Sequence, residues 1–342
     1  ILNYFQPVYS IGMTATPDTI TGYDIYALFD HNIAYEVRLQ DALEQDLLCP
    51  FHYYGISEIT VEGKLLDDVA GFNSLVCDER VQHIISNAEY YGFSGNRVKG
   101  LIFCSRKEEA YELSHKFNLR GYKTTVLTGE DSQTVREEMI TRLCDDEIAE
   151  TQQLDYIFTV DIFNEGVDLP EVNQIILLRP TQSPVVFTQQ LGRGLRKHEN
   201  KEYVVVLDFI GNYTNNYMIP IALSGDISCN KDNLRHYVLE STRCIPGSSA
   251  VHFDEISRKR IFSAIDHAKL NTIQDIKKHY TNLKYRLGRI PSLLDFDRYG
   301  ELDPLCIFDN NSLGSYHAFL SKYEKEYTVS FTQQQEMILT FV

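Results

Sequence analysis

Short apolar runs alternate with longer amphipathic segments through the middle of the chain. The runs are apolar at nearly every position, which is typical of strands buried on both faces of a sheet. Residues 75–92, 107–119 and 132–143 have helical spacing, and Pro184 suits the first turn of a further helix. This alternation predicts an α/β fold, a parallel sheet with helices on both faces. The predicted strands are residues 100–104, 123–128, 154–160, 173–179 and 203–209.

The pattern differs on either side of this region. The segment YSIGMTATP (9–17) predicts a short strand that runs into a turn, and RLQDALEQDLL (38–48) has helical spacing within a mixed connecting region. After about residue 218 the periodicity is helical, with a candidate flexible break at CIPGSSA (244–250). One helix predicted there has an apolar stripe made of Ile273, Ile276, Tyr280, Leu283 and Leu287. The predicted parts are residues 1–40, an α/β domain at 41–220 and a mainly helical domain at 221–342.

Composition narrows the class of protein. A chain of 342 residues, 43% hydrophobic, is long enough for two or three domains with their own cores. No apolar run approaches the roughly 18 to 20 residues of a membrane span, and no secretory leader opens the sequence, so we expect a soluble, cytoplasmic protein without membrane contact. The seven cysteines form no CxxC pair and have no histidine at ligand spacing. We therefore expect free thiols and no metal site.

Charge is distributed unevenly along the chain. The net charge of -16 argues against a protein that binds nucleic acid over its whole surface. Residues 1–224 contain 17 Lys and Arg against 33 Asp and Glu, whereas residues 225–342 contain 15 of each. Residues 258–289 alone carry a net charge of +7. The lysines there are either a solvated helix face or part of a nucleic-acid path, for which the candidates are Lys277, Lys278 and Lys284.

Two arginines three residues apart are the first candidates for chemistry. In VVFTQQLGRGLRK (185–197), Arg193 and Arg196 alternate with Gly192 and Gly194. Arginines at this spacing on a helix most often face solvent or form surface ion pairs. Here, however, the predicted helix leads into a buried strand, which places the arginines near an edge of the sheet, where ligands bind in α/β folds. The glycines would let the backbone approach a neighbour closely.

Four segments in order resemble motifs III to VI of superfamily 2 helicases, in the DEAD/DEAH-related branch that includes type III restriction and repair helicases. The segments are GMTATP (12–17), LIFCSRKEEA (101–110), VDIFNEGVD (160–168) and QQLGRGLR (189–196). Together the resemblance covers about residues 1–213. It implies that residues 1–40 end a first RecA-like motor domain, that 41–220 form the second, and that 221–342 form an accessory domain.

The resemblance assigns roles around the nucleotide. Arg193 and Arg196 would be arginine fingers, because guanidinium groups are permanently charged, planar donors suited to the γ-phosphate in phosphoryl transfer. Gln189 would join the nucleotide or the interdomain hydrogen-bond network. In motif V, Gly166 would allow a tight loop and Asp168 would contact ribose or position an arginine, with Glu165 beside it. The alternative is that these two acids are solvated loop residues.

The resemblance also implies contacts to nucleic acid. Thr14, Ala15 and Thr16 would couple the ATP site to the nucleic-acid track, although composition alone favours ordinary strand-end residues at Thr14 and Thr16. Ser105 and Arg106 follow one predicted strand, and Thr128 and Gly129 follow the next. Hydroxyls, backbone N–H groups and arginine at such positions bind the sugar-phosphate backbone. An ordinary surface arginine is the alternative for Arg106.

Two motifs that a nucleotide motor requires do not occur in the sequence: the GxxxxGK[ST] loop and the DExx acidic pair. In the family both precede motif III, so we expect ATP and Mg²⁺ to be bound mainly by an upstream motor domain of the same polypeptide. We expect this chain to be inactive alone. The predicted function is the C-terminal part of an ATP-dependent helicase or translocase acting on DNA. The alternatives are a helicase-derived interaction module without ATPase chemistry, or an unrelated α/β nucleotide-binding enzyme.

Overall fold

The computed structural model divides the chain into two compact units. The sheet unit consists of Val37–Gly225 and Arg235–Asp266, and the helical unit of Ile1–Glu36, Asp226–Leu234 and His267–Val342. The residues described are 8–14, 26–29, 32–35, 37–61, 63–160, 162, 169–181, 183–226, 228–240, 245–246, 248–270, 272–299, 302–310, 312–332, 334–335 and 338.

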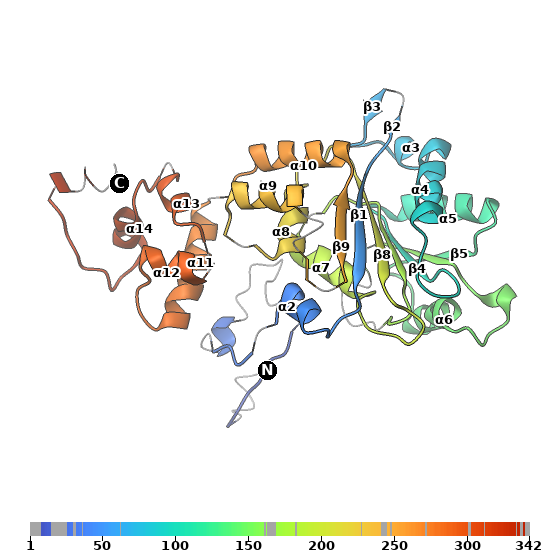
Figure 1. Ribbon diagram of the computed structural model, residues 1–342, viewed down its shortest axis with the longest axis horizontal. Helices are drawn as coiled ribbons and strands as arrows, with labels where there is room; N and C mark the ends of the chain where they lie inside the picture. The colour runs from blue at the N-terminus through green and yellow to red at the C-terminus, as the bar shows by residue number, and fades with distance from the viewer. Residues whose placement is uncertain are drawn as a thin grey trace. The chain divides into compact units, whose positions relative to one another are not determined.

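Seven parallel strands form the main sheet of the described chain, in the order β5-β6-β4-β7-β8-β1-β9 (Figure 1). The predicted parallel sheet is thereby confirmed, and each of the five predicted strands is present. The strands are β1 (Phe51–Ser57), β4 (Gly100–Phe103), β5 (Thr124–Leu127), β6 (Tyr156–Thr159), β7 (Gln174–Leu177), β8 (Val204–Ile210) and β9 (Ala250–Phe253). A separate antiparallel pair is formed by β2 (Thr60–Val61) and β3 (Lys64–Leu65).

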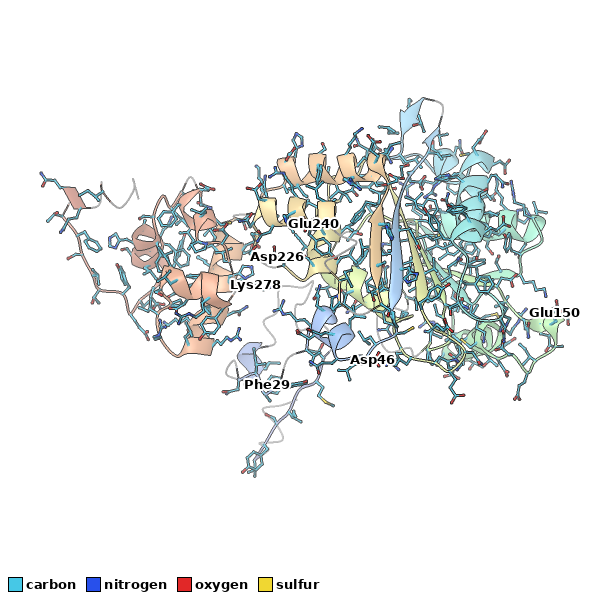
Figure 2. All side chains as sticks on the ribbon, in the orientation of Figure 1. Phe29, Asp46, Glu150, Asp226, Glu240 and Lys278 are labelled. Carbon is cyan, nitrogen blue, oxygen red and sulfur yellow. The ribbon has the colours of Figure 1, made fainter. Side chains whose placement is uncertain are left out.

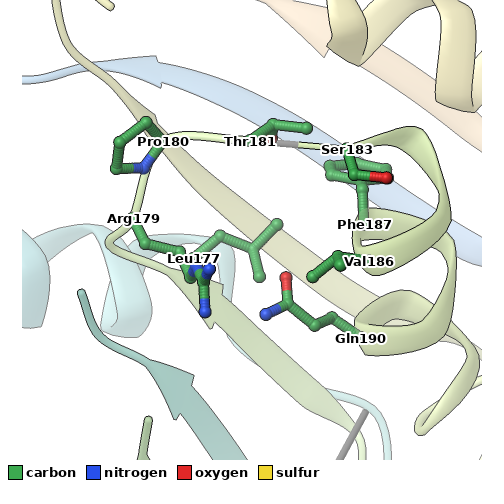
Figure 3. Close-up of a pocket in the computed structure, with 8 residues that line it drawn as sticks. All are labelled: Leu177, Arg179, Pro180, Thr181, Ser183, Val186, Phe187 and Gln190. Atoms are coloured by element: carbon green, nitrogen blue, oxygen red, sulfur yellow. The ribbon is translucent and has the colours of Figure 1, made fainter. Parts of the chain in front are cut away.

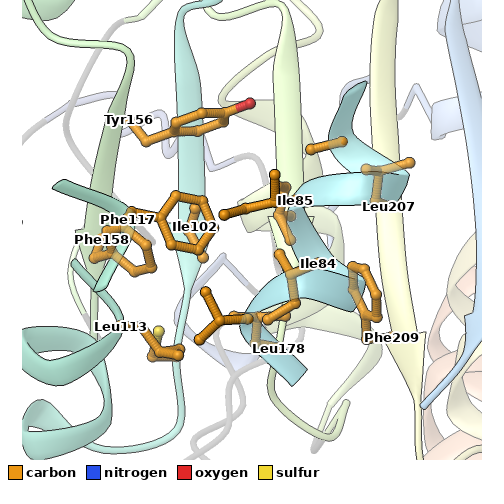
Figure 4. Close-up of a cluster of buried hydrophobic side chains, with 14 of the residues drawn as sticks. Ile84, Ile85, Ile102, Leu113, Phe117, Tyr156, Phe158, Leu178, Leu207 and Phe209 are labelled. Atoms are coloured by element: carbon orange, nitrogen blue, oxygen red, sulfur yellow. The ribbon is translucent and has the colours of Figure 1, made fainter. Parts of the chain in front are cut away.

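Helices cover both faces of the sheet. Successive side chains of a strand point to opposite faces and so contact different helices. On β1, Tyr54 stacks on Tyr91 of α4 (Asp78–Tyr91) with ring centres 4.0 Å apart, whereas the ring of Tyr53 lies 6.1 Å from that of Phe187 in α7 (Pro184–Gly192). Helices α4 and α5 (Lys107–Leu119) enclose the larger apolar core with the strands (Figure 4). The helices of the sheet unit include α2 (Leu39–Glu44), α3 (Phe72–Leu75), α4 (Asp78–Tyr91), α5 (Lys107–Leu119), α6 (Gln133–Cys144), α7 (Pro184–Gly192), α8 (Met218–Ser224) and α10 (Glu255–His267).

The sheet contains two strands that were not predicted, and one of them, β9, lies beyond the predicted α/β domain of residues 41–220. Strand β1 was expected to be a connecting segment, yet it pairs with β8 on one side and with β9 on the other. Strand β9 comes from the part predicted to be helical, and its first residue, Ala250, is the last residue of the expected flexible break. The compact sheet unit therefore reaches Asp266, beyond the predicted boundary at residue 220, because β9 completes the edge of the sheet beside β1.

The helical unit has its own core, and a mainly helical C-terminal region is thereby confirmed. Ile276, Tyr280 and Leu283 of the predicted apolar stripe are buried in this core, and Leu287 packs against it. The helices are α11 (Ile273–Leu287), α12 (Leu293–Tyr299), α13 (Leu305–Phe308) and α14 (Tyr316–Tyr323). Residues 231–234 of α9 (Lys231–Glu240) belong to the helical unit and residues 235–240 to the sheet unit. Two short 3-10 helices are η1 (Tyr26–Phe29) and η2 (Glu150–Gln152).

Residues 8–14 are exposed and adopt neither helix nor strand. The short strand predicted here is not observed, because a strand requires a hydrogen-bonded neighbour and no strand of the described residues pairs with this segment. Thr14 is exposed, while Ala15 and Thr16 lie outside the described residues. Among the described helices, each is too short or too polar to cross a membrane.

Candidate active site at the turn after helix α7

Helix α7 begins and ends with clear local signals. Ser183 caps its N-terminus by accepting a hydrogen bond from the backbone N–H of Val185 at 3.2 Å, and Pro184 occupies the first turn. The helix ends at Gly192, so Arg193 and Arg196 lie in the turn that follows, whereas the sequence predicted both on the helix. Glycine disfavours helix continuation, and the chain closes with a bond from the N–H of Gly194 to the carbonyl of Leu191 at 3.1 Å.

The two arginines have different surroundings. Arg193 is half-buried, and its Nε donates to the carbonyl oxygen of Gln189 at 3.1 Å. Arg196 is exposed. Gln189 itself is buried, with 8% of its surface exposed, and its carbonyl is thus part of the support for the turn. The structure therefore brings the three residues of the predicted arginine motif together. Their turn contacts Cys49 and Lys201, which precede β1 and β8, so it lies at the amino ends of these strands and not at the carboxyl ends, where α/β folds bind ligands.

The turn is held closely against the sheet. A Cβ atom at Gly194 would lie 3.0 Å from Cγ1 of Val204 and 3.1 Å from Cδ1 of Ile175, so the backbone approaches the sheet at a distance that a larger residue would increase. At Gly192 a Cβ would meet no atom within 4 Å. The close approach expected of both glycines thus applies to Gly194 alone, and here the neighbour is the sheet.

Three contacts from other segments fix the turn. The backbone N–H of Cys49 donates to the carbonyl of Leu195 at 2.7 Å. Nζ of Lys201 donates to the carbonyl of Gly194 at 2.7 Å. Directly after the turn, Nζ of Lys197 lies 2.7 Å from Oδ2 of Asp46, which follows α2 (Figure 2). The backbone between the two arginines is therefore held from both sides.

A small hollow lies between the end of β7 and α7. The side chains of Arg179 and Gln190 both point into it (Figure 3). Gln190 is 3% exposed, and its Nε2 has no hydrogen-bond acceptor among the described residues. Neither residue was predicted from the sequence as part of a site. Both stand within or beside the apolar pattern of a strand and a helix, which gives no signal for a polar site.

The predicted motif V residues Glu165, Gly166 and Asp168 lie outside the described residues. The segment that contains them connects β6 to β7 in sequence, and both strands pair in parallel with β4. Its described end, at Pro170 and Val172, lies beside the turn after α7 through shared contacts with Lys201.

The loop after β4 contains the predicted nucleic-acid residues Ser105 and Arg106, and both are exposed. Nη2 of Arg106 donates to the carbonyl of Ala70 at 3.1 Å. The backbone N–H of Ser105 donates to Oε2 of Glu109 at 3.0 Å, and Oε1 of this buried carboxylate accepts from Arg80 at 2.8 Å. The fully buried ion pair of Arg80 with Glu109 therefore orients the carboxylate that binds the backbone of this loop.

The loop after β5 is only partly available for contacts. Thr128 is buried, and both its N–H and its hydroxyl donate to Oδ2 of Asp131, at 2.6 and 3.2 Å. Gly129 is exposed. This loop meets the loop after β4 through the ion pair of Lys107 with Glu130, 2.5 Å apart. The structure therefore brings the two predicted contact loops together, but the polar groups of Thr128 are used within its own turn.

The candidate lysines of the helical unit differ in how far their side chains are already engaged in contacts within the protein. Nζ of Lys284 lies 2.8 Å from Glu324 and 3.0 Å from Glu326, so its charge is already paired. Nζ of Lys277 lies 3.7 Å from the ring centre of Tyr323. Lys278 is exposed on α11 (Figure 2). In the described residues, no group of three or more His, Cys, Asp or Glu is arranged to hold a metal ion.

Part of the chain that includes this turn matches a known protein family. Residues 80–198, which include the turn and both arginines, match the family described as "Helicase conserved C-terminal domain". These residues form a superfamily 2 helicase C-terminal domain. Residues 276–342 match a domain of unknown function, DUF8090.

Relatives of the helicase domain occur in yeast and phage. IRC3 of Saccharomyces cerevisiae, named as a candidate ATP-dependent helicase, is 25% identical over 210 residues, which are 59% of this chain and 29% of IRC3. The 51.5 kDa protein of a Lactococcus phage is 22% identical over 214 residues, 62% of this chain and 46% of that protein. This chain therefore spans less than half the length of these relatives.

Among solved structures, a fragment of a candidate HsdR subunit of a type I restriction enzyme from Vibrio vulnificus is similar to this chain. It has a TM-score of 0.47 and 24% sequence identity, covering 61% of this chain and 41% of the fragment.

Proposed function

We propose that this chain supplies the second motor half of an ATP-dependent helicase or translocase. The turn after α7 is the observation that carries this proposal. Its backbone is fixed by Gly194 against the sheet and by Cys49 and Lys201 from other segments, and Arg196 is exposed at its end. A rigid backbone that presents guanidinium groups suits arginine fingers, which stabilise charge on the γ-phosphate in the transition state.

The proposed nucleotide is ATP with Mg²⁺. The 342 residues contain neither the phosphate-binding GxxxxGK[ST] loop nor the DExx pair, so we propose that these come from an upstream motor domain of the same polypeptide. Glu165, Gly166 and Asp168 would approach the nucleotide from this chain, and Thr14, Ala15 and Thr16 would couple its hydrolysis to the nucleic acid. Six described cysteines are free thiols, which suits the reducing cytoplasm.

We propose DNA as the nucleic acid, contacted through Ser105, Arg106 and Gly129. The Lys107–Glu130 ion pair supports this by joining the two loops into one surface. Thr128 would shape its loop through Asp131, since its own donors are engaged there. Stimulation of ATP hydrolysis by DNA and RNA strands of the same sequence distinguishes the two substrates; stronger stimulation by RNA would contradict this assignment.

The arginine assignment is tested in a polypeptide that joins this chain to a motor domain with the P-loop. We expect Arg196→Ala, and Arg193→Ala with it, to retain ATP binding while hydrolysis falls by about 10³ to 10⁵. Arg142→Ala is a matched control, because Arg142 is also half-buried and its Nε donates to a backbone carbonyl, that of Gln152, at 2.8 Å. Losses below about tenfold in both finger variants would mean that these arginines are structural.

A further inference from the structure

Lys201 is a buried lysine whose three ammonium donors all bind backbone carbonyls. Its side chain lies just before β8, and the residue is 6% exposed. Nζ is 2.5 Å from the carbonyl oxygen of Pro170, 3.0 Å from that of Val172 and 2.7 Å from that of Gly194. An ammonium group has three N–H donors and no acceptor, so these contacts use its full capacity.

The three carbonyls belong to two segments that adjoin residues to which the proposed function gives a role in ATP hydrolysis. Gly194 lies between Arg193 and Arg196, and its carbonyl direction sets the path of the backbone through the turn. Pro170 and Val172 follow the motif V segment closely in sequence. A single ammonium therefore links the residues that follow motif V to the centre of motif VI.

We propose that Lys201 is a positioning residue that holds the turn of Arg193 and Arg196 in register with Pro170 and Val172, which follow motif V. The inference rests on the proposed function, because it concerns how the arginines are aimed. A displacement of about 1 Å at a reacting group can lower a rate by about a hundredfold. Without the ammonium, three buried carbonyls would lose a charged donor, and of the two hydrogen bonds described here from other segments to the backbone of the turn, that of Cys49 would remain.

The experiment uses the two-domain polypeptide and the variant Lys201→Met, which keeps an unbranched side chain but removes the donors. We expect kcat for ATP hydrolysis to fall by at least about tenfold, while the KM for ATP and the affinity for a DNA oligonucleotide change by less than about threefold. The matched control is Lys99→Met. Lys99 is equally buried, and its Nζ donates to the carbonyl of Cys144 and to Asp146, but not to the turn.

A double variant separates positioning from general stability. If Lys201 acts through the arginines, Lys201→Met should change the residual rate of Arg196→Ala by less than about twofold. An undiminished effect of Lys201→Met in that background, or equal losses of kcat for the Lys99 and Lys201 variants, would overturn the inference and leave the proposed function intact. Near wild-type hydrolysis by both arginine variants would instead reject the proposed function.

The pH profile gives a readout that does not depend on the folding of Lys201→Met. Burial lowers the pKa of Lys201 to about 8, and the titratable groups that face it are Cys49, Glu171 and Cys144. A neutral amine has two donors for three carbonyls, so we expect kcat of the unmodified polypeptide to fall above about pH 8. In Arg196→Ala this alkaline decrease should be absent; if the decrease persists there unchanged, the inference is wrong.

Discussion

At the scale of single residues, the contacts of the two glycines beside Arg193 predict different roles. A Cβ at Gly194 would crowd Val204 and Ile175 in the sheet, whereas a Cβ at Gly192 would meet open space. The side chains of Val204 and Ile175 are buried in the sheet and cannot move away cheaply, because a packed interior resists small displacements. The identity of residue 194 therefore determines how closely the turn fits, and the identity of residue 192 does not.

Alanine at these two positions should separate their effects on stability. We expect Gly194→Ala to lower the free energy of unfolding by about 1 to 3 kcal/mol through overpacking. Gly192→Ala ends a helix with a better helix former and should change the free energy by less than about 1 kcal/mol. Urea denaturation of the chain measures both, and equal effects at the two positions would contradict this account.

Asp208 is a second residue whose properties depend on its surroundings, because burial shifts its pKa. It lies on β8 within an otherwise apolar strand and is 2% exposed. The hydroxyl of Tyr53 donates to its Oδ2 at 2.6 Å. Burial raises the pKa of Asp208 to about 7, although the hydrogen bond from Tyr53 opposes that rise. Between about pH 4 and 7 the folded chain thus binds a proton here that the unfolded chain has released.

Stability should therefore fall through this group as pH rises from about 4 to 7. Asp208→Asn keeps an acceptor for Tyr53 and removes the titration. At each pH we compare the free energy of unfolding of Asp208→Asn with that of the unmodified chain. We expect the variant minus the unmodified chain to be about 2 to 3 kcal/mol more positive at pH 8 than at pH 5. Denaturation curves at the two pH values measure this, and a difference between the proteins that is independent of pH would show that Asp208 is not the titrating group.

At the scale of elements, local pattern predicted those whose partners are close in sequence. Residues 107–119 were predicted to be helical and form α5 with the same bounds, because their apolar spacing and flanking strands agree. Strand β1 was missed because FHYYGIS mixes aromatic and polar residues. Its partner strand β8 is also about 150 residues away in sequence. Such long-range pairing has no local signal.

The candidate site was predictable to a similar extent. The spacing of Arg193 and Arg196 is visible in the sequence, and it identified the segment that forms the turn. Lys201 was not identified, because its partners are backbone carbonyls, which every residue possesses and no residue type reveals. Lys284 was selected as a nucleic-acid contact from the charge count alone, which cannot show that Glu324 and Glu326 lie beside it.

The lysines of α11 should respond differently to substitution. Lys284→Gln leaves Glu324 without its ion pair and should destabilise the helical unit by about 1 to 2 kcal/mol. Replacing Lys277 and Lys278 together by Gln should preserve the fold, since both are exposed. If both contact phosphates, the slope of log affinity against log salt should become shallower by about 1.4 to 1.8. An unchanged slope and affinity for single-stranded DNA would mean that this helix face is solvated.

At the scale of the whole molecule, the two parts of the chain differ in charge. The helicase domain lies in the acidic part of the chain, whereas residues 225–342 carry balanced charge and a separate core. Attraction to nucleic acid would then depend on a few local groups rather than on the overall field, which opposes it. The chain spans 29% of IRC3 and 46% of the phage protein, so we expect the chemistry of a complete motor to involve further residues.

The chain alone should therefore show no ATP hydrolysis above background, with or without DNA. Arginine fingers stabilise charge on a γ-phosphate that other groups must first hold, and the phosphate-binding loop and the acidic pair do not occur in this sequence. Phosphate release by the purified chain measures this, with Arg196→Ala as the comparison, because a contaminating ATPase would be unaffected by that change. Sustained turnover that is lost in Arg196→Ala would show that the 342 residues contain a complete catalytic site, and the proposed dependence on a second motor domain would be wrong.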